Sequence, residues 1–180
     1  MNNPEYIKIN NEKIKINTDF RVGLACQRVA QDKTISDFER ALAIEYLLIG
    51  EKCFEIQDQE HLLKLLLKYL SLDEEVKNDK PDMDFMQDAD LIYASFMSDY
   101  SIDIEKTDMH WWTYIKLLRG LTEDSVLNRV REIRNMDVSN YDEKTKQKIL
   151  KAKKEFALKY EKPLNDNARR FYREMGIERK

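Results

Sequence analysis

The residues of this chain best suited to chemistry are two histidines, two cysteines and a set of acidic side chains. His61 and His110 fit no His-x-x-x-His or His-Glu-x-x-His pattern, and no Cys-x-x-Cys pair occurs, so we expect no zinc site. Cys26 and Cys53 lie in apolar helical contexts, which is typical of reduced, buried thiols. A nucleophilic pair of Cys53 with His61 stays open, although an expected helix break separates them.

Phosphate and cation binding also lack their usual sequence patterns. The four glycines form no Gly-rich phosphate loop. Asp79, Asp82 and Asp84 lack the spacing and the glycine of a calcium-binding loop, which favours a solvated loop. Asp88 and Asp90 are one pair among many acids and do not indicate acid–base catalysis. We therefore expect no enzyme activity, no metal and no cofactor.

Both tryptophans are adjacent, in the stretch DMHWWTYIKLLRGL at residues 108–121. Neighbouring side chains on a helix point about 100° apart, so the two rings cannot both enter one narrow core stripe. Helical spacing predicts that Trp111 lies in the core. The residues expected on or beside its face are Tyr114, Ile115 and Leu118.

Trp112 is expected at the edge of that face, aligned with Arg119. A cation–π contact between the two would cover the core edge, and amphipathic aromatic residues are also common at protein interfaces. Trp112 and Arg119 are therefore candidates either for an intrachain boundary or for partner binding. His110 is interpreted as a polar residue at the helix start and not as a ligand.

The chain's composition, with 36% charged and 42% hydrophobic residues, three prolines and four glycines, predicts a helix-rich globular protein. No apolar signal region follows Met1, and no stretch is long enough for a membrane span, so neither is expected. The fold class predicted is mainly α, with about six to seven helices and a small N-terminal β-hairpin. The hairpin is expected at residues 6–16, with a turn at Asn11-Glu12 that pairs Ile9 with Ile14 and Ile7 with Ile16.

Apolar periodicity and capping residues predict where the helices lie. Thr18 is expected to cap the first, Ser36 to open the second with a capping box, and Gly50 to end it. Thr122 is expected to cap the sixth. The predicted spans are 18–32, 36–50, 58–72, 85–100, 108–121, 122–133, 142–160 and a short last helix at 164–175.

The helix predicted at 58–72 has an unusually wide apolar arc, wider than a one-sided surface helix needs. A central helix packed on two sides explains this arc. The alternative is that part of the face, with Leu63 and Leu67 as candidates, binds another chain. We divide the chain into a helical domain at 1–136, with a hinge proposed at 73–84, and a basic helical extension at 137–180.

Charge is unevenly spread along the sequence, whose net charge is −3. Residues 73–108 hold twelve acidic against three basic residues, whereas 137–180 hold thirteen basic against eight acidic residues. The acidic middle and the basic end could attract each other within or between subunits. Nucleic-acid binding is not expected, because no recognisable reader motif accompanies the basic end.

Two stretches together resemble a known family. DFMQDADLIYASFMSDYSIDI at 84–104 and MHWWTYIKLLRGL at 109–121 are similar to small phage proteins, the Gp15 phage protein family. Their genes lie between those of the major tail protein and the tape-measure protein in siphophages and prophages of Gram-positive bacteria. Ser101 departs from the pattern, which has a glycine there, and we recognise no resemblance after about residue 135. The matching motif and core residues are Asp88, Asp90, Tyr93, Phe96, His110, Trp111, Tyr114 and Leu118.

The resemblance implies a non-enzymatic tail assembly chaperone that acts in the host bacterial cytoplasm. Such proteins bind the tape-measure protein, self-associate, and are absent from the mature virion; the major tail protein is a further candidate partner. Two alternatives stay open: a structural tail or connector protein retained in the virion, and a small helical DNA-binding regulator. Detection in virions would favour the first alternative, and strongly salt-dependent duplex binding the second.

Overall fold

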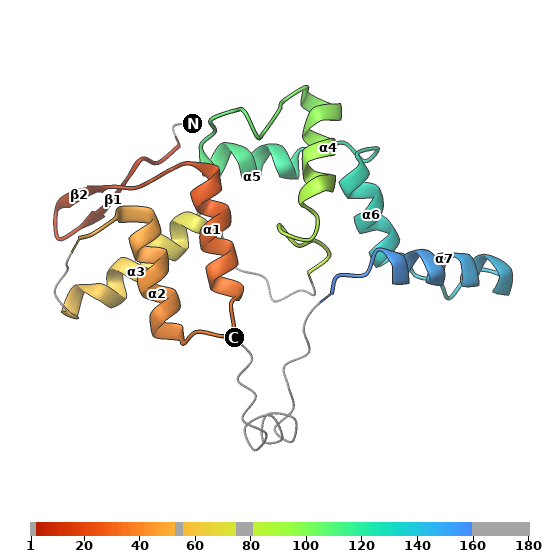
Figure 1. The fold of residues 1–180 in the computed structure, drawn as a ribbon, viewed down its shortest axis with the longest axis horizontal. Coiled ribbons are helices and arrows are strands. Elements are labelled where there is room, and N and C mark those ends of the chain that lie inside the picture. The colour runs from red at the N-terminus through yellow and green to blue at the C-terminus, as the bar shows by residue number, and fades with distance from the viewer. Residues whose placement is uncertain (1–2, 53–55, 75–80, 160–180) are drawn as a thin grey trace, which may run out of the picture.

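A computed structural model describes residues 3–52, 56–74 and 81–159 (Figure 1). These residues form seven helices and one two-stranded antiparallel hairpin, which confirms the predicted mainly α fold with an N-terminal hairpin. The elements are β1 (Tyr6–Ile9), β2 (Glu12–Lys15), α1 (Phe20–Gln31), α2 (Asp37–Ile49), α3 (Ile56–Leu70), α4 (Ala89–Tyr100), α5 (Trp111–Arg119), α6 (Val126–Asn135) and α7 (Glu143–Glu155).

The helices divide between two sides of the molecule, with α5 lying between them (Figure 1). On one side α1 packs against α2, α2 against α3, and α3 against the hairpin. On the other side α4 packs against α6, and α6 against α7. Because α5 packs against both α1 and α4, it joins the two sides. The buried cluster is correspondingly continuous from the hairpin isoleucines to Leu127 of α6.

The hairpin turns at Asn10 and Asn11, not at the predicted Asn11-Glu12. Both asparagines have a positive φ, 46° and 65°. Such turns suit asparagine, which tolerates the left-handed region far better than glutamate does. Ile7 consequently pairs with Ile14, and Ile9 with Glu12, so the predicted register is wrong. The error is two residues, which leaves each isoleucine on its predicted, buried face because strand faces alternate with a period of two.

Two predicted helix caps are also wrong. α1 begins after Asp19, whose carboxylate accepts a hydrogen bond from the backbone N–H of Arg21, and not after Thr18. α6 begins one turn later than predicted, with Ser125 as its cap. Thr122 instead donates from its backbone N–H and its hydroxyl to the carboxylate of Asp99, at 2.7 and 2.9 Å. This pair of bonds ties the α5–α6 connection to the end of α4.

Other helix ends follow the sequence more closely. Ser36 and Glu39 form the predicted capping box of α2, and Gly50, with φ 73°, ends that helix. α4 ends at Ser101, whose φ of 55° is the left-handed conformation that a glycine favours. α4 and α7 are shorter than predicted, because 85–88 form turns and α7 stops at Glu155. The short helix predicted at 164–175 and Cys53 lie outside the described residues.

Candidate protein-binding groove

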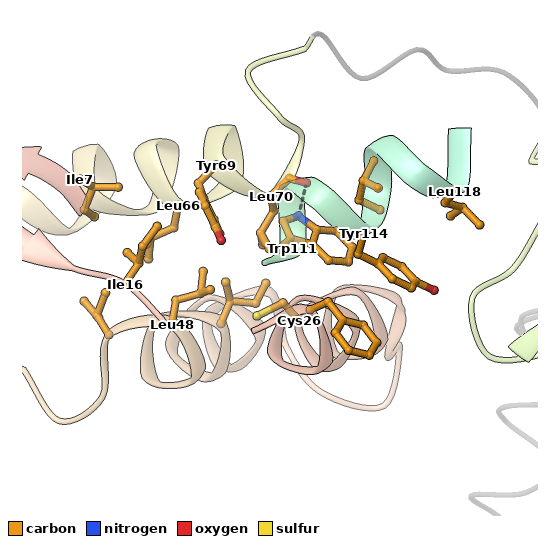
Figure 2. Close-up of a cluster of buried hydrophobic side chains, with 14 of the residues drawn as sticks. Ile7, Ile16, Cys26, Leu48, Leu66, Tyr69, Leu70, Trp111, Tyr114 and Leu118 are labelled. Atoms are coloured by element: carbon orange, nitrogen blue, oxygen red, sulfur yellow. Dashed lines mark hydrogen bonds between the residues drawn. The ribbon is translucent and has the colours of Figure 1, made fainter. Parts of the chain in front are cut away.

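The adjacent tryptophans of α5 both bind the C-terminal end of α3. Trp111 is only 1% exposed, and its indole Nε1–H donates to the carbonyl of Leu70 at 3.0 Å (Figure 2). The half-buried Trp112 donates its Nε1–H to the preceding carbonyl, that of Tyr69, at 2.9 Å. The last carbonyls of a helix have no partner within the helix. Two indoles that point in different directions thus satisfy two successive carbonyls at the end of α3.

Gly23 of α1 leaves room for the indole of Trp111. A Cβ atom built on Gly23 would lie 2.2 Å from Cε3 of Trp111, which is far inside van der Waals contact. Gly23 therefore permits the close approach of α1 and α5. A lone glycine inside an apolar helical pattern is the sequence signal that could have revealed this approach. Aromatic packing continues along α5, where Tyr114 stacks between Phe20 and Phe96 at centroid distances of 4.8 and 5.3 Å.

His110 caps α5 and is fully occupied by backbone partners. Its Nδ1 accepts a hydrogen bond from the backbone N–H of Trp112 at 3.0 Å, and its Nε2 lies 3.0 Å from the carbonyl oxygen of Pro4. Because the first partner can only donate and the second can only accept, these contacts fit the neutral ring with its proton on Nε2. The side chain thus fixes the start of α5 and the N-terminal segment, and neither ring nitrogen is directed at a ligand.

The predicted contact between Trp112 and Arg119 is wrong. The cation over the Trp112 ring is Lys116, whose Nζ lies 5.4 Å from the ring centroid. Lys116 is one helical turn from Trp112 and reaches the ring directly, whereas Arg119 is two turns away. Arg119 instead pairs with Glu74, Nη1 to Oε1 at 2.6 Å, at the end of the turn that follows α3.

The two motif carboxylates have different surroundings. Asp88 is 1% exposed and forms a bidentate pair with Arg134 of α6, with both N–O distances at 2.7 Å. Arg134 also donates to the carbonyls of Asp82 and Phe156, so one guanidinium connects α6, the start of α4 and the end of α7. Asp90 is exposed in the first turn of α4. Asp88 thus holds helices together.

The remaining motif residues pack in the hydrophobic core or at its margin. Phe96 is fully buried, Leu118 is 6% exposed, and Tyr93 is half-buried at the margin of the cluster. These positions explain the aromatic and leucine spacing of the motif as packing between α4 and α5.

A cavity of about 620 Å³ opens between α1, α3 and α5. Leu67, which is 45% exposed, and Arg119 both line it, so the structure brings together two of the candidate partner-binding residues. Trp112 lines a different cavity of about 430 Å³, between α3 and the hairpin. Leu63 is half-buried and lies in neither wall. We call the first cavity the α3–α5 groove; its walls comprise Cys26, Gln27, Ala30, Ile44, Leu67, Leu70, Ser71, Leu72, Glu74, Phe85, Trp111, Ile115 and Arg119.

The groove has an apolar floor and one charged edge. Ile115 and Trp111 of α5 and Leu70 of α3 face it from buried positions, and the Arg119–Glu74 pair lies at the rim. Burial raises the pKa of the Cys26 thiol to about 12, which keeps it protonated and uncharged at neutral pH. Such a surface suits apolar side chains of another segment. Of these wall residues the sequence patterns pointed to only Leu67 and Arg119 as partner-binding candidates, because single-helix periodicity does not reveal that α1, α3 and α5 meet at one groove.

Within residues 3–52, 56–74 and 81–159 no cluster of three or more His, Cys, Asp or Glu residues is arranged to hold a metal ion. The helices of these same ranges include none that is long and apolar enough to cross a membrane.

Comparison with known proteins gives one match. The family model described as Bacteriophage Gp15 protein matches residues 2–158, which covers α1 to α7 and the hairpin. No curated protein and no solved structure matches the chain.

Proposed function

We propose that this chain, which belongs to the bacteriophage Gp15 protein family, is a non-enzymatic chaperone of phage tail assembly. In this proposal it binds apolar segments of the tape-measure protein in the host cytoplasm, self-associates during assembly, and leaves before the virion is complete. The major tail protein is a second candidate partner. A chaperone of this kind needs a surface that binds apolar segments, and it needs no catalytic group.

The observation that carries the proposal is the α3–α5 groove. Its volume of about 620 Å³ lies within the range of ligand-binding clefts in proteins. Leu67 keeps 45% of its surface exposed to solvent at the groove. Burial of this apolar surface by a bound partner would be favourable. Full burial of a leucine is worth roughly 1.5–3 kcal/mol, so burial of the exposed part of Leu67 contributes about 1 kcal/mol. An amphipathic helix that inserts apolar side chains is the mode of binding such a groove favours.

Co-expression with the tape-measure protein tests the proposal. We expect the wild-type chain to keep the tape-measure protein soluble and to co-purify with it. Leu67→Lys should reduce the co-purified amount by about tenfold, since it removes apolar contact and places a charge in the groove. Met97→Lys is the matched control, because Met97 is similarly exposed, at 41%, on α4 and outside the groove wall.

Two results would contradict the proposal. One is a tape-measure protein that stays insoluble, or is soluble but unbound, when the wild-type chain is present. The other is detection of the chain at stoichiometric level in purified virions, which would instead indicate a structural tail component.

A further inference from the structure

α2 carries an apolar stripe that no described residue covers. Phe38, Leu42 and Tyr46 are 66%, 42% and 59% exposed. They are spaced by four residues, so they follow one another along a single face of the helix. Scattered apolar side chains on a surface are ordinary, but three large ones in a row on one helix face indicate a contact surface. We call these three residues the α2 stripe.

Acidic residues flank the α2 stripe on both sides. Glu39, which is exposed, and Glu45, which is half-buried, each lie three residues from Leu42, one on either side of the stripe. Arg40, the basic residue of α2, pairs with Asp37 and donates to the backbone carbonyl of Ile35, just before the helix. Two α2 helices packed against each other would therefore bring glutamates together without compensating cations. The partner of this stripe has to supply basic residues around an apolar side chain.

α7 supplies that combination. It has no buried residue, and Leu150 is 46% exposed on its outer side. Lys146, which is half-buried, and the exposed Lys154 lie one turn before and one turn after Leu150, and the exposed Lys151 adjoins this face. The inner side of α7 is held to the body by bonds such as that from Lys153 Nζ to the carbonyl of Met136, at 2.6 Å. Among the residues that the structure describes, none buries the outer side, which is therefore accessible to another molecule.

We propose that α7 of one copy docks on the α2 stripe of a second copy, with Leu150 against Leu42 and its flanking lysines facing Glu39 and Glu45. α2 and α7 lie at opposite ends of the molecule, so a chain cannot make this contact with itself (Figure 1). The contact joins unlike surfaces, and repetition of it produces rings or open filaments rather than a closed dimer. The inference rests on the self-association included in the proposed function and names its two surfaces.

Sedimentation velocity on the full chain tests the contact. We expect the wild type to associate reversibly. Leu42→Lys and Leu150→Lys should each weaken association by about tenfold, because each puts a charge into the apolar contact. Glu105→Lys, a charge reversal at an exposed loop residue, is the control and should leave association unchanged. Far-UV circular dichroism should show unaltered helix content in every variant, since all the substituted side chains are exposed.

A charge exchange tests the pairing itself. Glu45→Lys and Lys154→Glu should each weaken association by about threefold. An equimolar mixture of the two variants should associate more strongly than either alone, because the reversed α2 then meets the reversed α7. Absence of this recovery would overturn the assignment of the two surfaces.

Failure of this contact and failure of the chaperone role give different results. A chain that captures the tape-measure protein but stays monomeric overturns only the contact. A chain that associates through these faces but captures no tape-measure protein overturns only the proposed function. If Leu42→Lys abolishes tape-measure capture and leaves association intact, the α2 stripe binds the tape-measure protein and the proposed contact is wrong.

Discussion

Substitution of the two adjacent tryptophans should have clearly unequal effects on stability. Trp111→Ala removes a side chain that is 1% exposed, and truncation of a buried tryptophan costs about 3–5 kcal/mol. It also leaves the Leu70 carbonyl without its indole donor, which adds about 1 kcal/mol. Trp112→Ala removes a half-buried ring, its bond to the Tyr69 carbonyl and its stacking on Tyr69 at a centroid distance of 6.2 Å. We expect that loss to be about 1–2 kcal/mol.

Urea unfolding followed by far-UV circular dichroism measures both free energies directly. For a chain of this length, 1 kcal/mol corresponds to roughly 2–4 °C in Tm. Trp111→Ala should therefore lower Tm by about 8–24 °C and Trp112→Ala by about 2–8 °C. Each variant retains a single tryptophan, so its fluorescence gives an independent unfolding curve. Equal losses of free energy in the two variants would refute the division of the pair into a core residue and an edge residue.

Three further predictions concern positions that the structure singles out. Gly23→Ala should lower the free energy of unfolding by about 3 kcal/mol, because its Cβ would overlap the buried indole of α5; urea unfolding tests this, and a neutral effect would contradict the close approach. Asp88→Asn should cost about 3–5 kcal/mol, because it removes the carboxylate charge from a closely paired and largely buried ion pair. The control Asp90→Asn, at an exposed site, should cost less than about 1 kcal/mol. In a Cys53→Ser background, Cys26 should resist iodoacetamide at about pH 8 until the protein unfolds, since its raised pKa disfavours the thiolate; mass spectrometry would detect any native-state alkylation that contradicts this.

Local patterns in the sequence were sufficient for much of the fold. Helix capping depends on residues three apart, so the capping box at Ser36 and the stop at Gly50 could be predicted. The hairpin face could be predicted as well, because it depends only on alternation. The predicted register was wrong, although the greater tolerance of Asn10 than of Glu12 for a positive φ favours the observed turn. The cap of α6 was wrong for a non-local reason: Thr122 is bound to Asp99.

The candidate site was less predictable, because its parts come from separate helices. Leu67 and Arg119 were proposed from single-helix patterns, and both line the α3–α5 groove. Their common location could not be deduced, since it depends on how α3 and α5 pack. The partner of Asp88 could not be deduced either, because Arg134 lies 46 residues further on. Leu63, selected by the same pattern as Leu67, lies outside the groove walls, which shows the limit of choosing residues by apolarity alone.

The tryptophans connect the motif to the groove. Leu67 belongs to the last turn of α3, and the position of that turn relative to α5 is fixed by the indole bonds to the Tyr69 and Leu70 carbonyls. The same Trp111 ring forms part of the groove floor, because Gly23 allows α1 to approach it. One pair of residues thus sets both the depth of the groove and the placement of its exposed leucine. The residues of the motif are mostly buried, whereas Leu67, at the rim of the groove, is exposed. The motif is therefore better explained as the support of a binding surface than as a set of ligand contacts.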